Sequence, residues 1–66
     1  MRIDRIKMVC ELTRRDWNLK RLAKETGLSR NTLTAIKSGK SCNEVTAKAI
    51  ASALNLPLDE LKEKGD

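Results

Sequence analysis

Apolar residues recur along the chain at helical spacings, and five short helices are predicted. The first spans residues 2–13, and the connector 14–17 follows it. Its predicted buried face repeats at intervals of three and four residues: Ile3, Ile6, Val9, Cys10 and Thr13. We expect Trp17, in the connector, to cover the core between the first two helices rather than to stack on a base.

The second and third predicted helices span residues 19–26 and 30–38. Asn18 and Ser29 stand where a side-chain oxygen can cap the first turn of each helix. Gly27 ends the second helix, because glycine adopts a positive φ without a Cβ penalty. Leu33 and Ile36 should point inward. Two short helices joined by a three-residue turn that holds a glycine are typical of a helix-turn-helix, here at 19–38.

The fourth predicted helix spans residues 44–54, capped by Asn43, and a fifth starts near Pro57. In the fourth helix the apolar positions that should face the core are Ala47, Ile50, Ala51 and Leu54. Pro57 suits the first position of a helix, where a missing N–H costs nothing. Leu58 and Leu61 would anchor the fifth helix on the core.

Length and composition favour one all-α domain over residues 1–66 and exclude most enzyme classes. A chain of 66 residues leaves little room for a catalytic cleft. It has no His, Phe or Tyr, so the commonest general base and metal ligand is missing. We therefore expect no catalytic residue, metal or cofactor. Cys10 and Cys42 lack a CxxC spacing and should be buried thiols rather than a disulfide.

The positive charge is concentrated in the first two-thirds of the chain. The net charge is +5, with +7 in residues 1–40 and −2 in residues 41–66. This asymmetry favours a polyanion as partner, although a solvated basic surface remains the alternative. A membrane-surface helix would need a wide apolar face beside a basic one, and here the basic residues are shared among several elements. The chain has neither a long apolar run nor an apolar leader, so we expect a cytoplasmic protein.

The spacing of the glycines, caps and apolar residues resembles the Cro/repressor-type helix-turn-helix family, also called XRE-type regulators. Two runs carry the resemblance: Leu22-Ala23-x-x-x-Gly27-Leu28-Ser29-x-x-Thr32-Leu33-x-x-Ile36-x-x-Gly39-Lys40, then Thr46-Ala47-x-x-Ile50-Ala51-x-Ala53-Leu54-x-Leu56-Pro57-Leu58-Asp59-x-Leu61. It covers about residues 18–62. It implies a compact five-helix, lambda-repressor-like fold and sequence-specific binding of duplex DNA, usually as a dimer on an inverted repeat.

The chain departs from the family pattern at two positions that matter for DNA binding. Leu19 stands where the family often has a phosphate-binding Gln. Lys37 stands where it often has a Glu paired with an Arg of the first helix, and that Arg is missing too. Lys37 could instead pair with Glu11 or Asp16, or face DNA.

The outward residues of helix 30–38 would read bases in the major groove. Arg30 can donate two hydrogen bonds to guanine, and Asn31 can pair in the same way with adenine. Thr34 and Ala35 could touch a thymine methyl group. The Ser29 hydroxyl could reach a phosphate or a base as well as cap the helix.

Other residues would position the protein on phosphates. The free N–H groups at Asn18 and Leu19, with the positive end of the helix dipole, offer one such site, and Lys40 offers another. Weaker candidates are Arg14, Arg15 and Lys20, whereas a solvated face is expected for Arg2, Arg5 and Lys7.

The family resemblance also implies a homodimer. Its interface would involve Leu56, Pro57 and Leu58, unless these side chains only close the core. A transcriptional regulator, and specifically a repressor, is therefore the leading hypothesis. The competing hypothesis is a protein-interaction module, such as an antitoxin or adaptor, that kept the fold without reading DNA.

Overall fold

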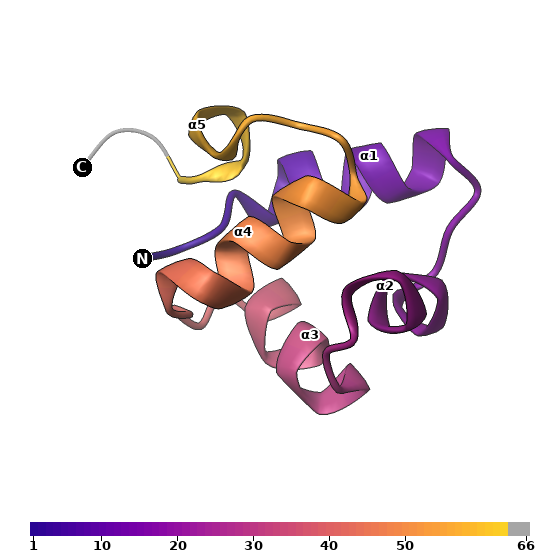
Figure 1. Cartoon of the computed structure of the whole chain (residues 1–66), viewed down its shortest axis with the longest axis horizontal. Helices are drawn as coiled ribbons and strands as arrows, with labels where there is room; N and C mark the ends of the chain where they lie inside the picture. Colours follow the sequence, from indigo (N-terminus) through magenta and orange to yellow (C-terminus); the bar gives the residue numbers. More distant parts are fainter. Residues whose placement is uncertain (64–66) are drawn as a thin grey trace.

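Five α-helices follow one another along the chain in the computed structural model, which describes residues 1–63 (Figure 1). They are α1 (Arg5–Arg14), α2 (Leu19–Thr26), α3 (Arg30–Lys37), α4 (Glu44–Ala53) and α5 (Leu58–Leu61). Across residues 1–63 the only β-type pairing is an isolated bridge between Ile3 and Lys62. The predicted all-α, five-helix class is confirmed.

Each of the first four helices begins at a residue whose side chain accepts a hydrogen bond from the first turn. The predicted caps Asn18, Ser29 and Asn43 accept from the backbone N–H groups of Arg21, Thr32 and Thr46, respectively. Asp4 caps α1 in the same way, so this helix begins at Arg5 and not at residue 2 as predicted. Local capping chemistry therefore sets most of the helix starts.

The helices end close to the residues that the sequence predicts, whereas the predicted start of α5 needs one correction. Gly27 follows α2 with φ of 76°, the left-handed conformation that allows the tight turn into α3. Asn55 takes a similar left-handed φ of 56° after α4. Pro57 has an extended conformation and precedes the first turn of α5, so it is the N-cap residue and not the first helical residue that we predicted.

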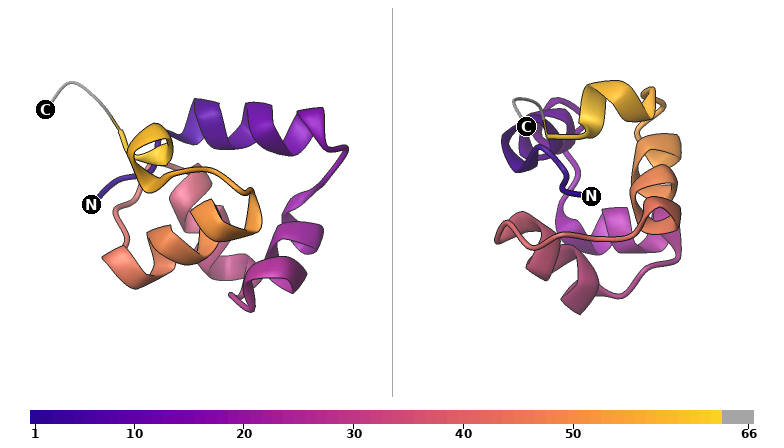
Figure 2. Two further views of the ribbon diagram at one scale, coloured as in Figure 1. Left: turned by 45° about the horizontal axis from the view of Figure 1, so that its top comes forward. Right: turned by 90° about the vertical axis from the view of Figure 1, so that its left-hand side faces the viewer.

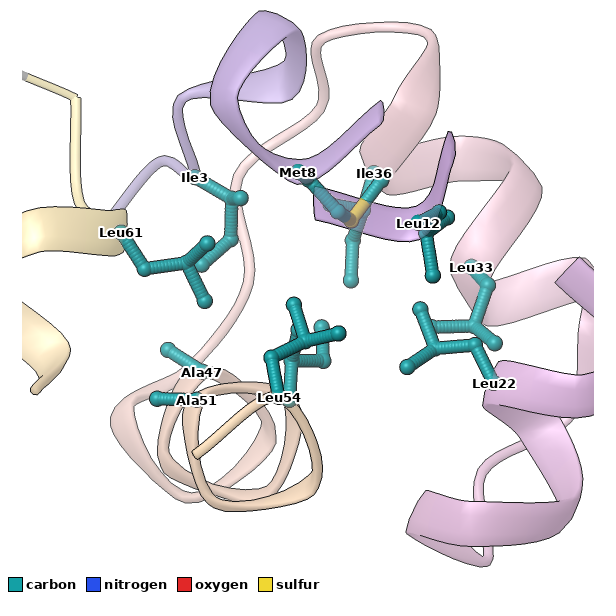
Figure 3. Packing of buried hydrophobic residues seen from close by; sticks show 11 residues of the cluster. Ile3, Met8, Leu12, Leu22, Leu33, Ile36, Ala47, Ala51, Leu54 and Leu61 are labelled. Carbon is teal, nitrogen blue, oxygen red and sulfur yellow. The ribbon is translucent and has the colours of Figure 1, made fainter. Parts of the chain in front are cut away.

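Within residues 1–63, eleven buried apolar side chains form the core, and they come from all five helices, the N-terminal segment and the residue that follows α4. They are Ile3, Met8, Leu12, Leu22, Leu33, Ile36, Ala47, Ile50, Ala51, Leu54 and Leu61. Figure 3 shows Leu22 and Leu33 lying against each other, so α2 and α3 are locked together directly through the core. All predicted inward positions of α3 and α4 are in this set.

The predicted buried face of the first helix is wrong. Ile6 is 71% exposed and Val9 36% exposed, and Cys10 and Thr13 also face outward. The buried side of α1 is instead formed by Met8, Glu11 and Leu12. Ile3 is buried as predicted, but from the extended segment that precedes α1.

The two ends of the described chain lie side by side (Figure 2). The N–H of Asp4 donates to the carbonyl of Leu61 at 2.8 Å, and the N–H of Glu63 donates to the carbonyl of Arg2 at 2.8 Å. These bonds hold α5 against the N-terminal segment and seat Leu61 beside Ile3 in the core (Figure 3).

Two further expectations concern cysteines and membranes. Both cysteines are free thiols, but Cys10 is exposed and Cys42 half-buried, so neither is fully buried as predicted. Partial burial raises the pKa of the Cys42 thiol. Within residues 1–63, no helix has both the length and the apolar character needed to cross a membrane.

The corrected register of α1 can be tested with a pair of truncations. Met8→Ala removes a fully buried side chain and should cost about 2–5 kcal/mol of unfolding free energy. That is comparable to the total of about 3–5 kcal/mol expected for a domain of this size, so the variant should be largely unfolded. Ile6→Ala should change the stability by less than about 0.5 kcal/mol. Urea unfolding followed by circular dichroism measures both, and a larger loss for Ile6→Ala would contradict this register.

Candidate nucleic-acid interface

The unit α2–turn–α3 is held rigidly by local hydrogen bonds as well as by the core. The Thr26 hydroxyl donates to the carbonyl of Leu22 at 2.7 Å, and the N–H of Leu28 donates to the Thr26 hydroxyl oxygen at 3.2 Å. With Gly27 in the left-handed conformation, these bonds fix the turn between the helices. The orientation of α3 relative to α2 is thus determined by residues 22–29.

The outer face of α3 carries polar side chains and is free of core contacts. Because Leu33 and Ile36 are buried, Arg30, Asn31 and Thr34 are turned to the solvent. Ala35 is half-buried on the edge of this face, so of the four predicted base-reading residues it is the least accessible.

Ser29 and Lys40 lie at the two ends of α3 and are both exposed. The Ser29 oxygen accepts from the N–H of Thr32 at 3.1 Å and lies 2.8 Å from the Thr32 hydroxyl. The predicted capping role of Ser29 is confirmed. The backbone N–H of Lys40 donates to the carbonyl of Ala35 at 3.1 Å, next to the C-terminus of α3, and the residue is exposed.

The N-terminus of α2 is accessible next to this face. Asn18 is exposed and its Oδ1 accepts from the N–H of Arg21 at 2.8 Å. The N–H groups of Leu19 and Lys20 have no acceptor within the helix, as in any first turn. The Leu19 side chain is half-buried against the core, so only the backbone N–H of this residue can bind an anion.

The sequence left the partner of Lys37 open, and the structure brings this residue to the start of α2. It lines a shallow groove together with Asn18, Leu19 and Trp17. Within residues 1–63 it forms no ion pair, so it pairs with neither Glu11 nor Asp16. A cation from α3 thus stands beside the predicted phosphate site.

Trp17 packs on the core between α1 and α2, as predicted. The Arg21 guanidinium lies over its ring, 4.8 Å from the centroid, and its Nε donates to Glu25 at 2.7 Å. The covered ring closes the core directly before the N-terminus of α2 and is not free to stack on a base.

Glu11 is a buried carboxylate surrounded by cations, and the sequence analysis did not identify this cluster. Its exposed fraction is 3%, and Arg15, Arg14 and Lys7 reach it at 2.6, 3.1 and 3.3 Å. The other arm of the Arg15 guanidinium donates to the carbonyl of Leu54 at 2.6 Å. Basic residues three and four positions from Glu11 in the sequence could have indicated this cluster.

The cluster lowers the pKa of Glu11 from 4.5 to about 2. The hydrogen bond from Arg15 is the largest cause; loss of solvent around Glu11 opposes it, and Lys7 and Arg14 add to the lowering. Arg15 therefore fastens the end of α1 to the end of α4, and its guanidinium is not free to bind a phosphate, contrary to its place among the weaker candidates. The connector that leads to Asn18 starts from this fastened point.

Arg2 and Arg5 are exposed, as predicted, and they also approach the loop that follows α3. Nε and Nη2 of Arg2 donate to the carbonyl of Gly39 at 3.2 and 2.9 Å. A Cβ placed on Gly39 would lie 3.6 Å from Nη1 of Arg5 and 3.9 Å from Nη2 of Arg2. Positive charge from the start of the chain is therefore added beside Lys40, and no local sequence signal predicts this contact.

These features together form an exposed polar helix, an accessible helix N-terminus beside it and a border of cations. A family model described as helix-turn-helix matches residues 6–61. The chain belongs to the Cro/repressor-type (XRE) helix-turn-helix family. No curated protein and no solved structure gave a significant match.

Membership of the XRE family makes the chain a DNA-binding transcription regulator of this type. Domains of this family are generally not enzymes. Within residues 1–63, no group of three or more Cys, Asp or Glu side chains could hold a metal ion.

The Glu11 cluster predicts an acid-dependent stability. A folded pKa below the unfolded one stabilises the protein fully above about pH 5, and this contribution is lost as the pH falls toward 2. Glu11→Gln should lower the melting temperature at about pH 6. Between about pH 6 and pH 3, the melting temperature of this variant should fall less than that of the wild type. Thermal melts by circular dichroism measure both effects. The matched control is Glu60→Gln, an exposed position that should keep the wild-type pH dependence. An equal pH dependence in Glu11→Gln would contradict the cluster's role.

Proposed function

We propose that the chain is a sequence-specific repressor that reads an operator in the major groove of DNA with α3. Residues 1–66 would act as one DNA-binding domain, and two copies would bind an inverted repeat. The observation that carries this proposal is the outward face of α3, where Arg30, Asn31 and Thr34 are exposed while Leu33 and Ile36 lock the helix to the core.

The chemistry of this face suits base edges. Arg30 offers a guanidinium fork to the two acceptors of guanine, and Asn31 offers an acceptor and a donor to adenine. The Thr34 methyl group, and Ala35 at the edge of the face, would contact thymine methyl groups. An exposed protein-docking helix would instead present apolar side chains, and none of these positions carries a large one.

Phosphate contacts would hold this helix in register. The N–H groups at Asn18 and Leu19 would bind one phosphate with help from the helix dipole. Lys40 would bind another beyond the C-terminus of α3, and the Ser29 hydroxyl a third in addition to its capping role. A domain bound in this way would repress by occupying DNA that polymerase needs.

The dimer would form through Leu56, Pro57 and Leu58. Leu56 and Leu58 are half-buried and pack against the core, whereas Pro57 is exposed. The segment therefore offers an apolar surface of limited area, which suits a weak dimer that is completed on DNA. Its half-sites would be about 34 Å apart, one turn of the duplex.

Selection from a random duplex library at about 0.15 M salt tests the proposed function. The wild-type chain should enrich an inverted repeat with half-sites about one helical turn apart. The double variant Arg30→Ala/Asn31→Ala should lose this enrichment, because each lost base contact costs about 1–3 kcal/mol of discrimination.

The variant should keep its helical circular dichroism and its weak, salt-sensitive binding to DNA of any sequence. Lys48→Ala, on the exposed side of α4, is the matched control and should enrich the wild-type motif. If the double variant still selects the same motif, α3 is not the reading helix.

The dimer contact can be separated from DNA reading with Pro57→Asp. Aspartate is a good N-cap, so α5 should keep its stability, while a charge enters the proposed contact. Cooperative binding to the two-site operator should fall and affinity for a single half-site should stay within about twofold of wild type. Gel-shift titrations on both duplexes measure this, and unchanged cooperativity would exclude Pro57 from the interface.

A further inference from the structure

The outward side of α1 and the end of α3 form a groove next to the candidate interface. It is lined by Arg5, Ile6, Val9, Cys10 and Lys37, and we call it the α1–α3 groove. Its floor is aliphatic, because Ile6 and Val9 are the apolar residues that the register of α1 leaves outside the core.

The α1–α3 groove is bordered by cations and has no acidic residue in its lining. Within residues 1–63, neither Arg5 nor Lys37 forms an ion pair. Arg2 stands beside them, but its guanidinium is held by the Gly39 carbonyl and lies 3.8 Å from Glu63. Arg5 and Lys37 are therefore the charges available to an anionic ligand.

This groove is continuous with the proposed DNA-binding surface. The neighbouring groove at the start of α2 contains Asn18 and Leu19, and the two grooves share Val9 and Lys37. Lys37 is also one turn from Thr34 on α3. A linear polyanion bound at the N-terminus of α2 can thus pass over Val9 into the α1–α3 groove without leaving the surface.

We propose that the α1–α3 groove receives the sugar–phosphate backbone of the bound duplex, on the strand whose phosphate sits at the N-terminus of α2. This inference rests on the proposed function. A nucleic-acid backbone combines charged phosphates with apolar sugar edges, and the lining of the groove combines two cations with an aliphatic floor. Arg5 and Lys37 would bind phosphates, and Ile6 and Val9 would contact deoxyribose. Arg2 would be a positioning residue that holds the Gly39 loop beside Arg5.

The test measures how binding to an unselected duplex of mixed sequence depends on salt. Loss of one phosphate contact reduces the slope of log K against log salt by about 0.9. Arg5→Ala should show this change. It should bind about fivefold more weakly than wild type at about 0.15 M salt, because a slope difference of about 0.9 gives that factor between about 1 M and about 0.15 M salt. Arg5→Lys should restore most of the slope. The matched control Lys48→Ala, on α4, should leave the slope unchanged.

A second variant pair tests the floor of the groove. Ile6 is 71% exposed, so Ile6→Glu and Ile6→Gln should both fold, which thermal melts confirm. Ile6→Glu places a carboxylate where phosphates would pass and should reduce binding more than tenfold, whereas Ile6→Gln should reduce it only a few-fold.

The outcomes separate this inference from the proposed function. Binding to an unselected duplex does not require base reading. The salt slopes therefore remain informative even if the wild-type chain selects no motif. That result would contradict the proposed function but not this inference. If Arg5→Ala keeps the wild-type slope and Ile6→Glu binds as Ile6→Gln does, the backbone does not enter the groove and the inference is overturned. The groove would then be free for an acidic protein segment. Titration with poly-glutamate, followed by NMR, would detect such binding as chemical-shift changes at the residues that line the groove.

Discussion

The rotation of α1 about its own axis depends on the burial of Glu11. A carboxylate at 3% exposure is tolerated only when it is paired. Here one arm of the Arg15 guanidinium donates to Glu11, and the other arm donates to the Leu54 carbonyl. Met8 and Leu12 lie on the same side of the helix as Glu11, so the cluster and the core select one orientation together. Removal of Arg15 would leave the buried carboxylate with only Lys7 and Arg14, at 3.3 and 3.1 Å, and would free the Leu54 carbonyl.

This orientation decides which residues α1 presents to the solvent. Ile6 and Val9 form an apolar stripe of their own, and burial of the Met8–Leu12 side leaves that stripe exposed. The exposed stripe lies beside Lys37 and Arg5 and so becomes the floor of the α1–α3 groove. An internal ion pair thereby shapes a surface on the outside of the same helix.

The small core within residues 1–63 also holds α3 in a fixed orientation. Leu22 and Leu33 lock α2 to α3, and α4 packs against α2 behind them. Local caps and the Gly27 turn supplement this small core, since a domain of this length buries only about 60% of its unfolded surface. The proposed base reading by α3 would benefit directly, because a helix that is fixed in the free protein loses little entropy on binding.

Features fixed by a few neighbouring residues were predictable. The caps at Asn18, Ser29 and Asn43, the turn at Gly27 and the inward positions of α3 and α4 follow from hydrogen bonds within one turn and from a single apolar stripe. The motif that identifies the family depends on the same local spacings. The outward residues Arg30, Asn31 and Thr34 followed from them by exclusion.

Features that join distant parts of the chain required the tertiary structure. The first helix carries two apolar stripes, and only packing against Leu33, Ile36 and Leu54 decides that Met8 is buried and Ile6 is not. The approach of Arg2 and Arg5 to Gly39 spans more than thirty residues and has no local signature. The sequence by itself determined the helices and the outward face of α3, because these depend on short-range bonds. The rotation of α1 and the cations beside α3 were decided only when the core closed, because only then do these long-range contacts exist.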